Sequence, residues 1–256
     1  RGGFVIQKVQ VEIAPLYTQR KLHIYLPNNY YESQERYPVM YMFDGHNLFD
    51  DRDATYGKSW GLQKFLDQYD KPFILIGLEC NHEGNERLNE FSPYTFSTPG
   101  LGNIYGKGDL LMRWMAEELK TWVDQRYRTY PNRECTGLGG SSMGGLMALY
   151  GVIRYNSFFS KAACLSPTVF GCYDLLMADL KKSDISPDTR VYMSLGSEEI
   201  SKDFFLKQLQ AYDQSFVDAL NDRQASAVFH LVHGGGHNEA SWEKENRIYF
   251  DYLWRR

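Results

Sequence analysis

The stretch Gly140-Ser141-Ser142-Met143-Gly144 constrains the fold more than any other part of the chain. It follows a short β-prone run, Arg133 to Leu138, and precedes a helical run from Leu146 to Ile153. A G-x-S-x-G pattern between a strand and a helix is typical of a tight turn that exposes a serine hydroxyl, because small neighbours let the backbone pass close to itself. The new helix also directs unpaired N–H groups toward whatever Ser142 attacks, so the N–H of Met143 is a candidate oxyanion donor.

Apolar runs along the rest of the chain predict a sheet. Phe4 to Ile13 and Lys21 to Leu26 alternate apolar and polar residues, which predicts an antiparallel strand pair at a sheet edge. Tyr37 to Phe43 is apolar without alternation, as expected of a strand buried on both faces. Further strands are predicted at Phe73 to Cys80, Arg133 to Leu138, Ala162 to Ser166, Val191 to Leu195 and Ala227 to Val232.

Helical patterns separate these strands. They lie at Trp60 to Tyr69, Asp109 to Tyr127 (with Asp109 as its cap), Phe205 to Leu220 and Arg247 to Trp254. Strands that alternate with helices imply a mostly parallel sheet with helices on both faces, which is the α/β class. A chain of 256 residues is long enough for one such domain, and we expect residues 1–256 to form it.

The segment Asn81 to Gly108 has no clear period, although it carries Gly, Pro, Asn, Ser and aromatic residues. An irregular stretch of this length is uncommon in a compact domain and is usually functional, so we expect a rim or cap loop over a pocket. Four aromatic residues in or near predicted rim segments are candidate substrate contacts, with plain packing as the alternative. These are Trp60, Phe96, Tyr105 and Trp242.

Composition narrows the possible partners. The net charge of −4 gives no basic excess for nucleic acid, and no apolar run approaches the ~20 residues of a membrane span. The first residues have no signal-peptide core, so we expect a cytoplasmic protein, while a processed secretion signal stays open. No C-x-x-C pair is present, which argues against a zinc or redox motif. Of Cys80, Cys135, Cys164 and Cys172, the first three are expected to be buried free thiols in a reducing compartment.

A serine nucleophile needs a base, usually histidine. His237 follows Gly234-Gly235-Gly236 beyond the last predicted strand, and active sites of parallel sheets lie outside the carboxyl ends of strands. His23 is expected on the surface of an edge strand, and His82 in the rim is a possible substrate contact. A metal set of His230, His233 and His237 is disfavoured, because His230 and His233 would face opposite sides of a strand and no carboxylates complete the set.

The histidine in turn needs a carboxylate, which should lie between serine and histidine in the chain. Glu198 and Glu199 both follow Gly196 after the next-to-last strand, and either fits. Either could instead be a favourable charge at a helix N-terminus. Asp174 lies off a strand end and Asp203 falls inside a helix, so both are weaker candidates.

Together these motifs resemble the putative-esterase branch of the α/β-hydrolase superfamily. That branch includes feruloyl and acetyl-xylan esterase domains, S-formylglutathione hydrolases, enterochelin esterases and mycolyl transferases. The resemblance covers nearly the whole chain. It rests on Tyr41 to Gly45, Gly140 to Gly145, Gly196 to Glu199, and Gly236-His237 followed by Trp242. The segment Asn85 to Tyr94 also resembles the rim segment of the family.

The resemblance implies an α/β-hydrolase fold and site roles for particular residues. The family's acid stands three residues after the glycine, which corresponds to Glu199, and its second oxyanion N–H corresponds to that of His46. We therefore expect a serine carboxylesterase with a Ser142–His237–Glu199 triad and no metal or organic cofactor. The expected substrate is a small-molecule or sugar ester, and the carbohydrate-linked candidates are acetyl and feruloyl esters. Acyl transfer, an S-formylglutathione-type thioesterase and a non-catalytic binding protein stay open as alternatives, and the oligomeric state is not indicated.

Overall fold

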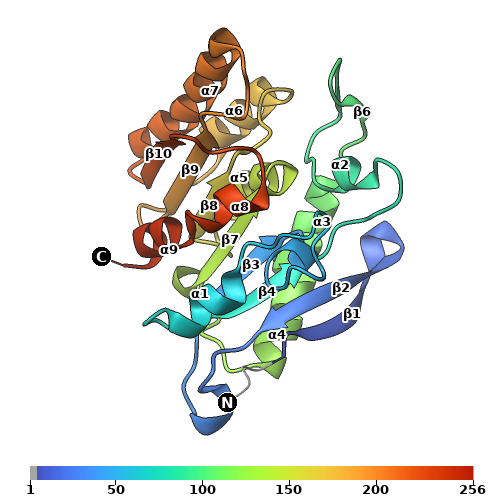
Figure 1. Cartoon of the computed structure of the whole chain (residues 1–256), viewed down its shortest axis with the longest axis vertical. Coiled ribbons are helices and arrows are strands. Elements are labelled where there is room, and N and C mark those ends of the chain that lie inside the picture. Colours follow the sequence, from blue (N-terminus) through green and yellow to red (C-terminus); the bar gives the residue numbers. More distant parts are fainter. Residues whose placement is uncertain (1–4, 256) are drawn as a thin grey trace.

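An eight-stranded sheet runs through the computed structural model, which describes residues 5–255 (Figure 1). Its strand order is β1-β2-β4-β3-β7-β8-β9-β10. The strands are β1 Gln7–Ile13, β2 Thr18–Tyr25, β3 Val39–Phe43, β4 Ile74–Leu78, β7 Thr136–Ser141, β8 Lys161–Leu165, β9 Arg190–Gly196 and β10 Ser226–Val232. β1 and β2 pair antiparallel, β2 also pairs antiparallel with β4, and the remaining strands are parallel. The predicted α/β class with a mostly parallel sheet is confirmed.

Alternating side chains of the strands form two separate core layers. In β3, Tyr41 and Phe43 belong to one apolar cluster, while Met40 and Met42 belong to the other. Strand geometry requires this division, because successive side chains point to opposite faces of a sheet. Both faces are apolar, which explains why the predicted central strands show no alternation in their sequence.

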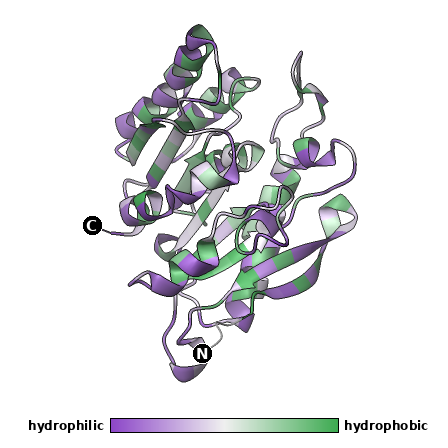
Figure 2. Cartoon of the chain, viewed as in Figure 1, coloured by the Kyte–Doolittle hydropathy of each residue, from purple (hydrophilic) through white to green (hydrophobic). Residues whose placement is uncertain are grey.

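Helices cover both faces of the sheet. The face with Met40 and Met42 packs against α1 Leu62–Gln68, α8 Glu239–Glu243 and α9 Asn246–Trp254. The other face packs against α3 Gly108–Trp114, a π-helical turn Met115–Leu119, α4 Lys120–Arg126, α5 Met143–Arg154, α6 Tyr173–Lys182 and α7 Asp203–Asp222. Figure 2 shows hydrophobic and hydrophilic residues alternating along α7, as expected of a helix with one buried face. Within residues 5–255, none of the helices is long and apolar enough to cross a bilayer.

The antiparallel pair β1–β2 forms as predicted, with β1 at the edge, but the expectation for His23 is wrong. β2 has a partner on each side, so His23 lies inside the sheet and is only 3% exposed. Its Nε2 lies 2.7 Å from a carboxylate oxygen of Glu79, which satisfies the buried ring.

The predicted helix Asp109 to Tyr127 forms with two differences. It begins one residue earlier and includes the π-helical turn, and Asp109 lies inside it rather than at its N-cap, which is Lys107. The Asp109 carboxylate instead accepts hydrogen bonds from the hydroxyls of Tyr150 and Tyr155 at 2.7 and 2.6 Å. These bonds tie α3 to α5, so the carboxylate holds two helices together.

The segment 81–108 has more structure than its sequence suggests. It contains α2 Glu86–Glu90 and a hairpin of β5 Phe96–Thr98 and β6 Gly102–Ile104, which projects from the body of the molecule in Figure 1. A buried ion pair of 2.7 Å between Arg20 and Glu90 fastens α2 to β2. The Asn89 side chain accepts the N–H of Tyr105 at 2.8 Å and so fixes the return of the hairpin. Short 3₁₀ turns complete the chain at Ala14–Leu16, Tyr30–Glu32, Gly45–Asn47 and Arg133–Cys135.

Candidate active site

Ser142 occupies the turn between β7 and α5 with a backbone that few residues adopt. Its φ and ψ are 59° and −123°, and a non-glycine residue held there is strained. A Cβ atom on Gly140 would lie 2.6 Å from the backbone of Gly144, so only glycine permits this close crossing. The Ser142 N–H donates to the carbonyl of Leu165 on β8, which fixes the turn against the sheet. The Ser142 Oγ lies 3.3 Å from the Oγ1 of Thr168.

His237 and Glu199 meet beside this turn. His237 lies in the loop between β10 and α8, and its Nδ1 is 2.6 Å from Oε1 of Glu199, which follows β9. The side chain of Glu199 is only 6% exposed, whereas Glu198 is exposed. Of the two glutamates that the sequence left open, the structure therefore brings Glu199 to the imidazole.

The second oxygen of Glu199 is held as firmly as the first. Oε2 accepts hydrogen bonds from the Ser166 hydroxyl and from the Gly196 N–H, both at 2.6 Å. The indole N–H of Trp242 donates to the Ser166 Oγ at 3.1 Å, and the Trp242 ring packs edge-on against His237 with centroids 5.1 Å apart. A carboxylate with three hydrogen bonds has little freedom to rotate, so it fixes the imidazole ring and its tautomer.

Ser142 and His237 both line a cavity of about 520 Å³ at the carboxyl edge of the sheet. Polar and apolar atoms contribute about equally to its wall. The other lining residues with polar or ionisable side chains include Asp44, His46, Asn47, His82, Arg87, Asn238 and Glu239. Such a cavity is large enough for a small ester and offers many partners for hydroxyl or carbonyl groups.

The turn after β3 presents the candidate second oxyanion donor. Asp44 has a φ of 58°, and Gly45 packs so closely on β4 that an added Cβ would lie 2.4 Å from the backbone of Gly77. Arg87 of α2 holds the Asp44 carboxylate through two hydrogen bonds of 2.9 and 2.7 Å. Burial alone would raise the pKa of Asp44, but the Arg87 ion pair outweighs it and leaves the pKa lowered. The N–H of His46 follows this anchored turn.

Four further ionisable side chains gather around His46. Glu79 binds His23 and His82 at 2.7 Å each, and these hydrogen bonds outweigh its burial and lower the pKa of Glu79 to about 2. Burial lowers the pKa of His46, with Asp44 and Glu79 acting in the opposite direction. Burial raises the pKa of the neighbouring Cys80 thiol to about 12. This wall of the cavity thus carries imidazole rings and a thiol beside anchored carboxylates.

The structure places the four predicted aromatic contacts in different surroundings. Trp242 lines the cavity, although most of its surface is buried. Trp60 is 2% exposed and packs in the core against Trp242 and Tyr249, so it has no access to the cavity and serves as a core residue. Phe96 and Tyr105 lie on or next to the β5–β6 hairpin, away from the lining described above. Tyr105 is 61% exposed, and Phe96 covers Gly171.

A smaller cavity of about 220 Å³ also has His237 in its wall. Ser166, Thr168, Glu199 and Asp213 line it with several apolar residues. Burial raises the pKa of Asp213 well above its usual range, and the charge of Glu199 adds to this effect. A raised pKa disfavours a second negative charge behind the imidazole.

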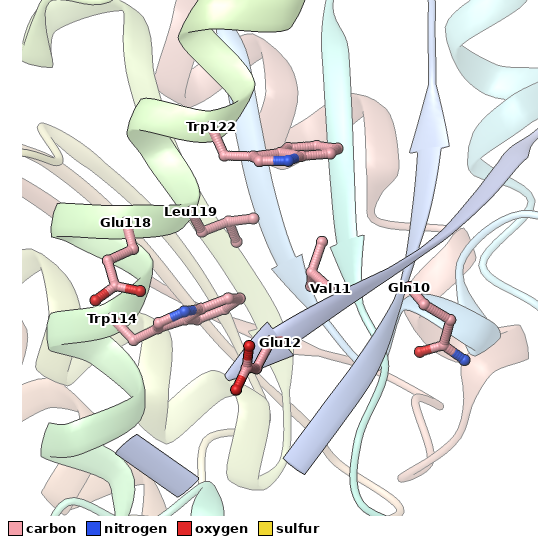
Figure 3. A pocket seen from close by; sticks show the side chains of 7 residues that line it. All are labelled: Gln10, Val11, Glu12, Trp114, Glu118, Leu119 and Trp122. Carbon is pink, nitrogen blue, oxygen red and sulfur yellow. The ribbon is translucent and has the colours of Figure 1, made fainter. Parts of the chain in front are cut away.

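Another cavity lies far from the serine in the fold, between β1 and the π-helical turn (Figure 3). The indole rings of Trp114 and Trp122 extend toward β1 with Leu119 between them, and Glu12 and Glu118 stand nearby. Its volume is about 280 Å³. Among the described residues its lining contains no serine, cysteine or histidine, so it has no counterpart of the serine–histidine pair that lines the larger cavity.

Sequence reasoning missed several residues of the site. Ser166 and Thr168 touch the acid and the serine, and Arg87 anchors the turn before His46. Ser166 ends a predicted strand, so its position at the carboxyl edge was a usable signal. Nothing in the sequence connects Arg87 with Asp44, since they are 43 residues apart.

Comparisons with known proteins agree with this architecture. The family model described as "Putative esterase" matches residues 14–245. The uncharacterized protein YbbA of Bacillus subtilis is 25% identical over 183 residues, which are 70% of this chain and 69% of that protein. An IroE-like serine hydrolase from Shewanella oneidensis superposes with a TM-score of 0.73 at 22% identity, over 97% of this chain and 78% of that one. The enterobactin esterase FES from Shigella flexneri gives a TM-score of 0.75 at 17% identity, over 98% of this chain and 59% of that one. The chain therefore has the α/β-hydrolase fold and belongs to the "Putative esterase" family.

Proposed function

We propose that this protein is a serine carboxylesterase whose nucleophile is Ser142. One observation carries the proposal. Ser142 stands on a strained turn and lines the same cavity as His237. Nδ1 of His237 is hydrogen-bonded to the buried side chain of Glu199. A strained serine in a cavity wall, a histidine and a fixed carboxylate are the three parts of acyl-transfer chemistry.

In the proposed reaction His237 accepts the Ser142 proton as the hydroxyl attacks the ester carbonyl. A small rotation of the serine side chain from Thr168 toward the imidazole precedes attack, since such hydrogen bonds often form only with substrate present. The N–H groups of Met143 and His46 bind the oxyanion. His237 then protonates the departing alcohol, and a water deprotonated by His237 releases the acid from Ser142.

For the substrate we propose an ester of a neutral, hydroxyl-rich alcohol such as a sugar, with an acetyl or feruloyl acyl group. The wall of the larger cavity supports this choice, because Asn238, Glu239 and His82 are suited to hydroxyl partners. Arg87 is the one Arg or Lys among its described lining residues, and it is already paired with Asp44. The cavity therefore lacks a free cation for an acidic alcohol or acyl group.

The deciding experiment compares Ser142→Ala with Ser141→Ala on 4-nitrophenyl acetate, feruloyl esters and acetylated sugars. Ser142→Ala should lower kcat by ~10⁴-fold or more with the fold retained, whereas Ser141→Ala, one residue earlier on β7, should cost far less. If Ser141→Ala is the inactive variant, the nucleophile is misassigned. If wild type cleaves none of these esters, the esterase proposal fails. Adding an acceptor alcohol and analysing products separates hydrolysis from acyl transfer.

A further inference from the structure

Two histidines and a cysteine meet in the wall of the larger cavity. His46 follows β3, and Cys80 and His82 follow β4, which is the neighbouring strand. Each offers one ligand atom, and the three atoms lie within 4.8 Å of one another. The Sγ of Cys80 is 3.7 Å from Nδ1 of His82. All three residues line the cavity together with Ser142.

The hydrogen bonds of His82 turn its free nitrogen toward the thiol. Its Nε2 lies 2.7 Å from Oε1 of Glu79, and a carboxylate can only accept, so the ring proton sits on Nε2. The lone pair of Nδ1 therefore faces Cys80, whose thiol can donate to it until a cation displaces the thiol proton. In proteins, a metal-binding histidine is commonly oriented by a carboxylate that accepts a hydrogen bond from the ring nitrogen not bound to the metal.

Among the described residues, His46 has one nitrogen with a hydrogen-bond partner and one without. Its Nε2 lies 3.1 Å from the Thr55 hydroxyl, whereas Nδ1 is buried and has no hydrogen-bond partner among residues 5–255. The residue is 5% exposed, and its ring packs edge-on against that of His82 with centroids 4.8 Å apart. A buried polar atom without a partner is costly and requires an explanation, which a bound ligand would supply.

We propose that His46, Cys80 and His82 bind one divalent cation of the zinc class, with the fourth coordination position open to the cavity. Two imidazole nitrogens and one thiolate suit zinc, whereas calcium and magnesium prefer oxygen ligands. Bond lengths of about 2.0–2.3 Å place tetrahedral ligand atoms about 3.5 Å apart, so small side-chain movements complete the site. Binding forms an Sγ–metal bond, and the Cys80 proton passes to solvent.

A cation at this position should inhibit ester turnover. It would occupy part of the wall that Ser142 also lines, and its ligand His46 carries the proposed oxyanion N–H. This consequence rests on the proposed function, but binding of the metal does not. The two claims can therefore be tested separately on the same protein.

Cobalt provides a direct readout of binding, because a cysteine ligand produces an intense near-ultraviolet charge-transfer absorption. Metal-free protein titrated with Co²⁺ should develop this band up to one Co²⁺ per chain, and Zn²⁺ should remove it. Cys80→Ser should abolish the band. Glu79→Gln should weaken Co²⁺ binding roughly 10- to 100-fold, as expected for loss of a carboxylate behind a ligand. His82→Gln should weaken it at least as much, and the exposure of His82 makes this variant safe for folding.

Matched variants elsewhere identify adventitious binding. Cys135→Ser removes a free thiol outside the cavity, and His230→Gln removes an exposed histidine of β10, so both should keep the band and its affinity. The proposal is overturned if wild type shows no band, if the band survives Cys80→Ser, or if it is lost in Cys135→Ser. Zinc inhibition of esterase activity should be weaker in His82→Gln than in wild type. If zinc inhibits His82→Gln as strongly as wild type although the variant binds the metal less tightly, the inhibitory role is refuted. If the protein has no esterase activity, the metal-binding result still stands.

Discussion

Replacing Glu199 by glutamine tests the triad most sharply, because the surroundings of the side chain dictate how the new amide must lie. The carboxylate has one oxygen on Nδ1 of His237 and the other on two donors, the Ser166 hydroxyl and the Gly196 N–H. Glutamine has a single oxygen. That oxygen must stay with the two donors, since an NH₂ group facing the Gly196 N–H would set two buried donors against each other.

The NH₂ group of the glutamine then faces His237 and donates to Nδ1. This moves the ring proton to Nε2, so the nitrogen nearest the serine can no longer accept its proton. A wrong tautomer of this kind costs up to ~10⁴-fold in a serine hydrolase. We therefore expect kcat/KM of Glu199→Gln to fall by ~10²- to 10⁴-fold, which is about 3 to 5.5 kcal/mol at 1.36 kcal/mol per tenfold.

The assay is hydrolysis of 4-nitrophenyl acetate by wild type, Glu199→Gln and Glu198→Gln, with circular dichroism to confirm folding. Glu198→Gln is the matched control, because its side chain is exposed and should change kcat/KM little. If kcat/KM falls strongly in Glu198→Gln and stays near wild type in Glu199→Gln, the acid is Glu198. If both variants keep wild-type kcat/KM, the acid lies elsewhere or the serine and histidine act alone.

Four other variants test the rim and the buried charges. Phe96 and Tyr105 lie outside the lining of the larger cavity, so Phe96→Ala or Tyr105→Ala should spare 4-nitrophenyl acetate and raise KM only for esters bulky enough to reach the hairpin, and equal losses on both substrates would indicate a structural role. Burial raises the pKa of Glu245 from 4.5 to about 7, so the contribution of this group to stability is fully present below pH 4.5 and is lost as pH rises through 7. The free energy of unfolding of Glu245→Gln should therefore exceed that of wild type by up to roughly 3 kcal/mol at pH 8 and equal it at pH 4. Thermal unfolding at the two pH values measures this difference, and a gain independent of pH would contradict the reasoning. Arg20→Met leaves Glu90 buried without its partner and should cost about 3–5 kcal/mol in urea unfolding, whereas a loss below 1 kcal/mol would mean that the pair is replaceable.

The central strands were predictable because they are apolar on both faces, as in Tyr37 to Phe43. Elements stabilised by contacts between residues far apart in the sequence were not predictable. The β5–β6 hairpin is too short to show a period, and Asn89 and Thr95 hold it through side-chain bonds to backbone N–H groups. Helix α6 was missed because exposed Leu175 adjoins buried Leu176 and Met177, which blurs the helical period.

The same division applies to the site. Ser142 and His237 follow from chain order and from the rule that strand ends meet at one edge of the sheet. The choice between Glu198 and Glu199 does not follow from these rules, because the Glu199 N–H donates a hydrogen bond back to the Gly196 carbonyl at 3.3 Å. The chain therefore turns after β9, and the alternation of an extended chain does not apply there. His46 reaches Cys80 only because β3 and β4 pair in parallel with Phe43 opposite Leu78, a register that the sequence does not reveal.

Backbone strain in this protein gathers at the edge where the cavity lies. Among residues 5–255, five non-glycine residues have positive φ, and three of them follow neighbouring strands of the sheet: Asp44 after β3, Ser142 after β7 and Ser166 after β8. Each such residue costs about 1–3 kcal/mol and persists only where its surroundings hold it. Arg87 holds Asp44, and Trp242 with Glu199 holds Ser166. The fully buried parallel strands supply the stability that lets these three turns keep their geometry, so the part of the molecule that was easiest to predict supports the part that performs the proposed chemistry.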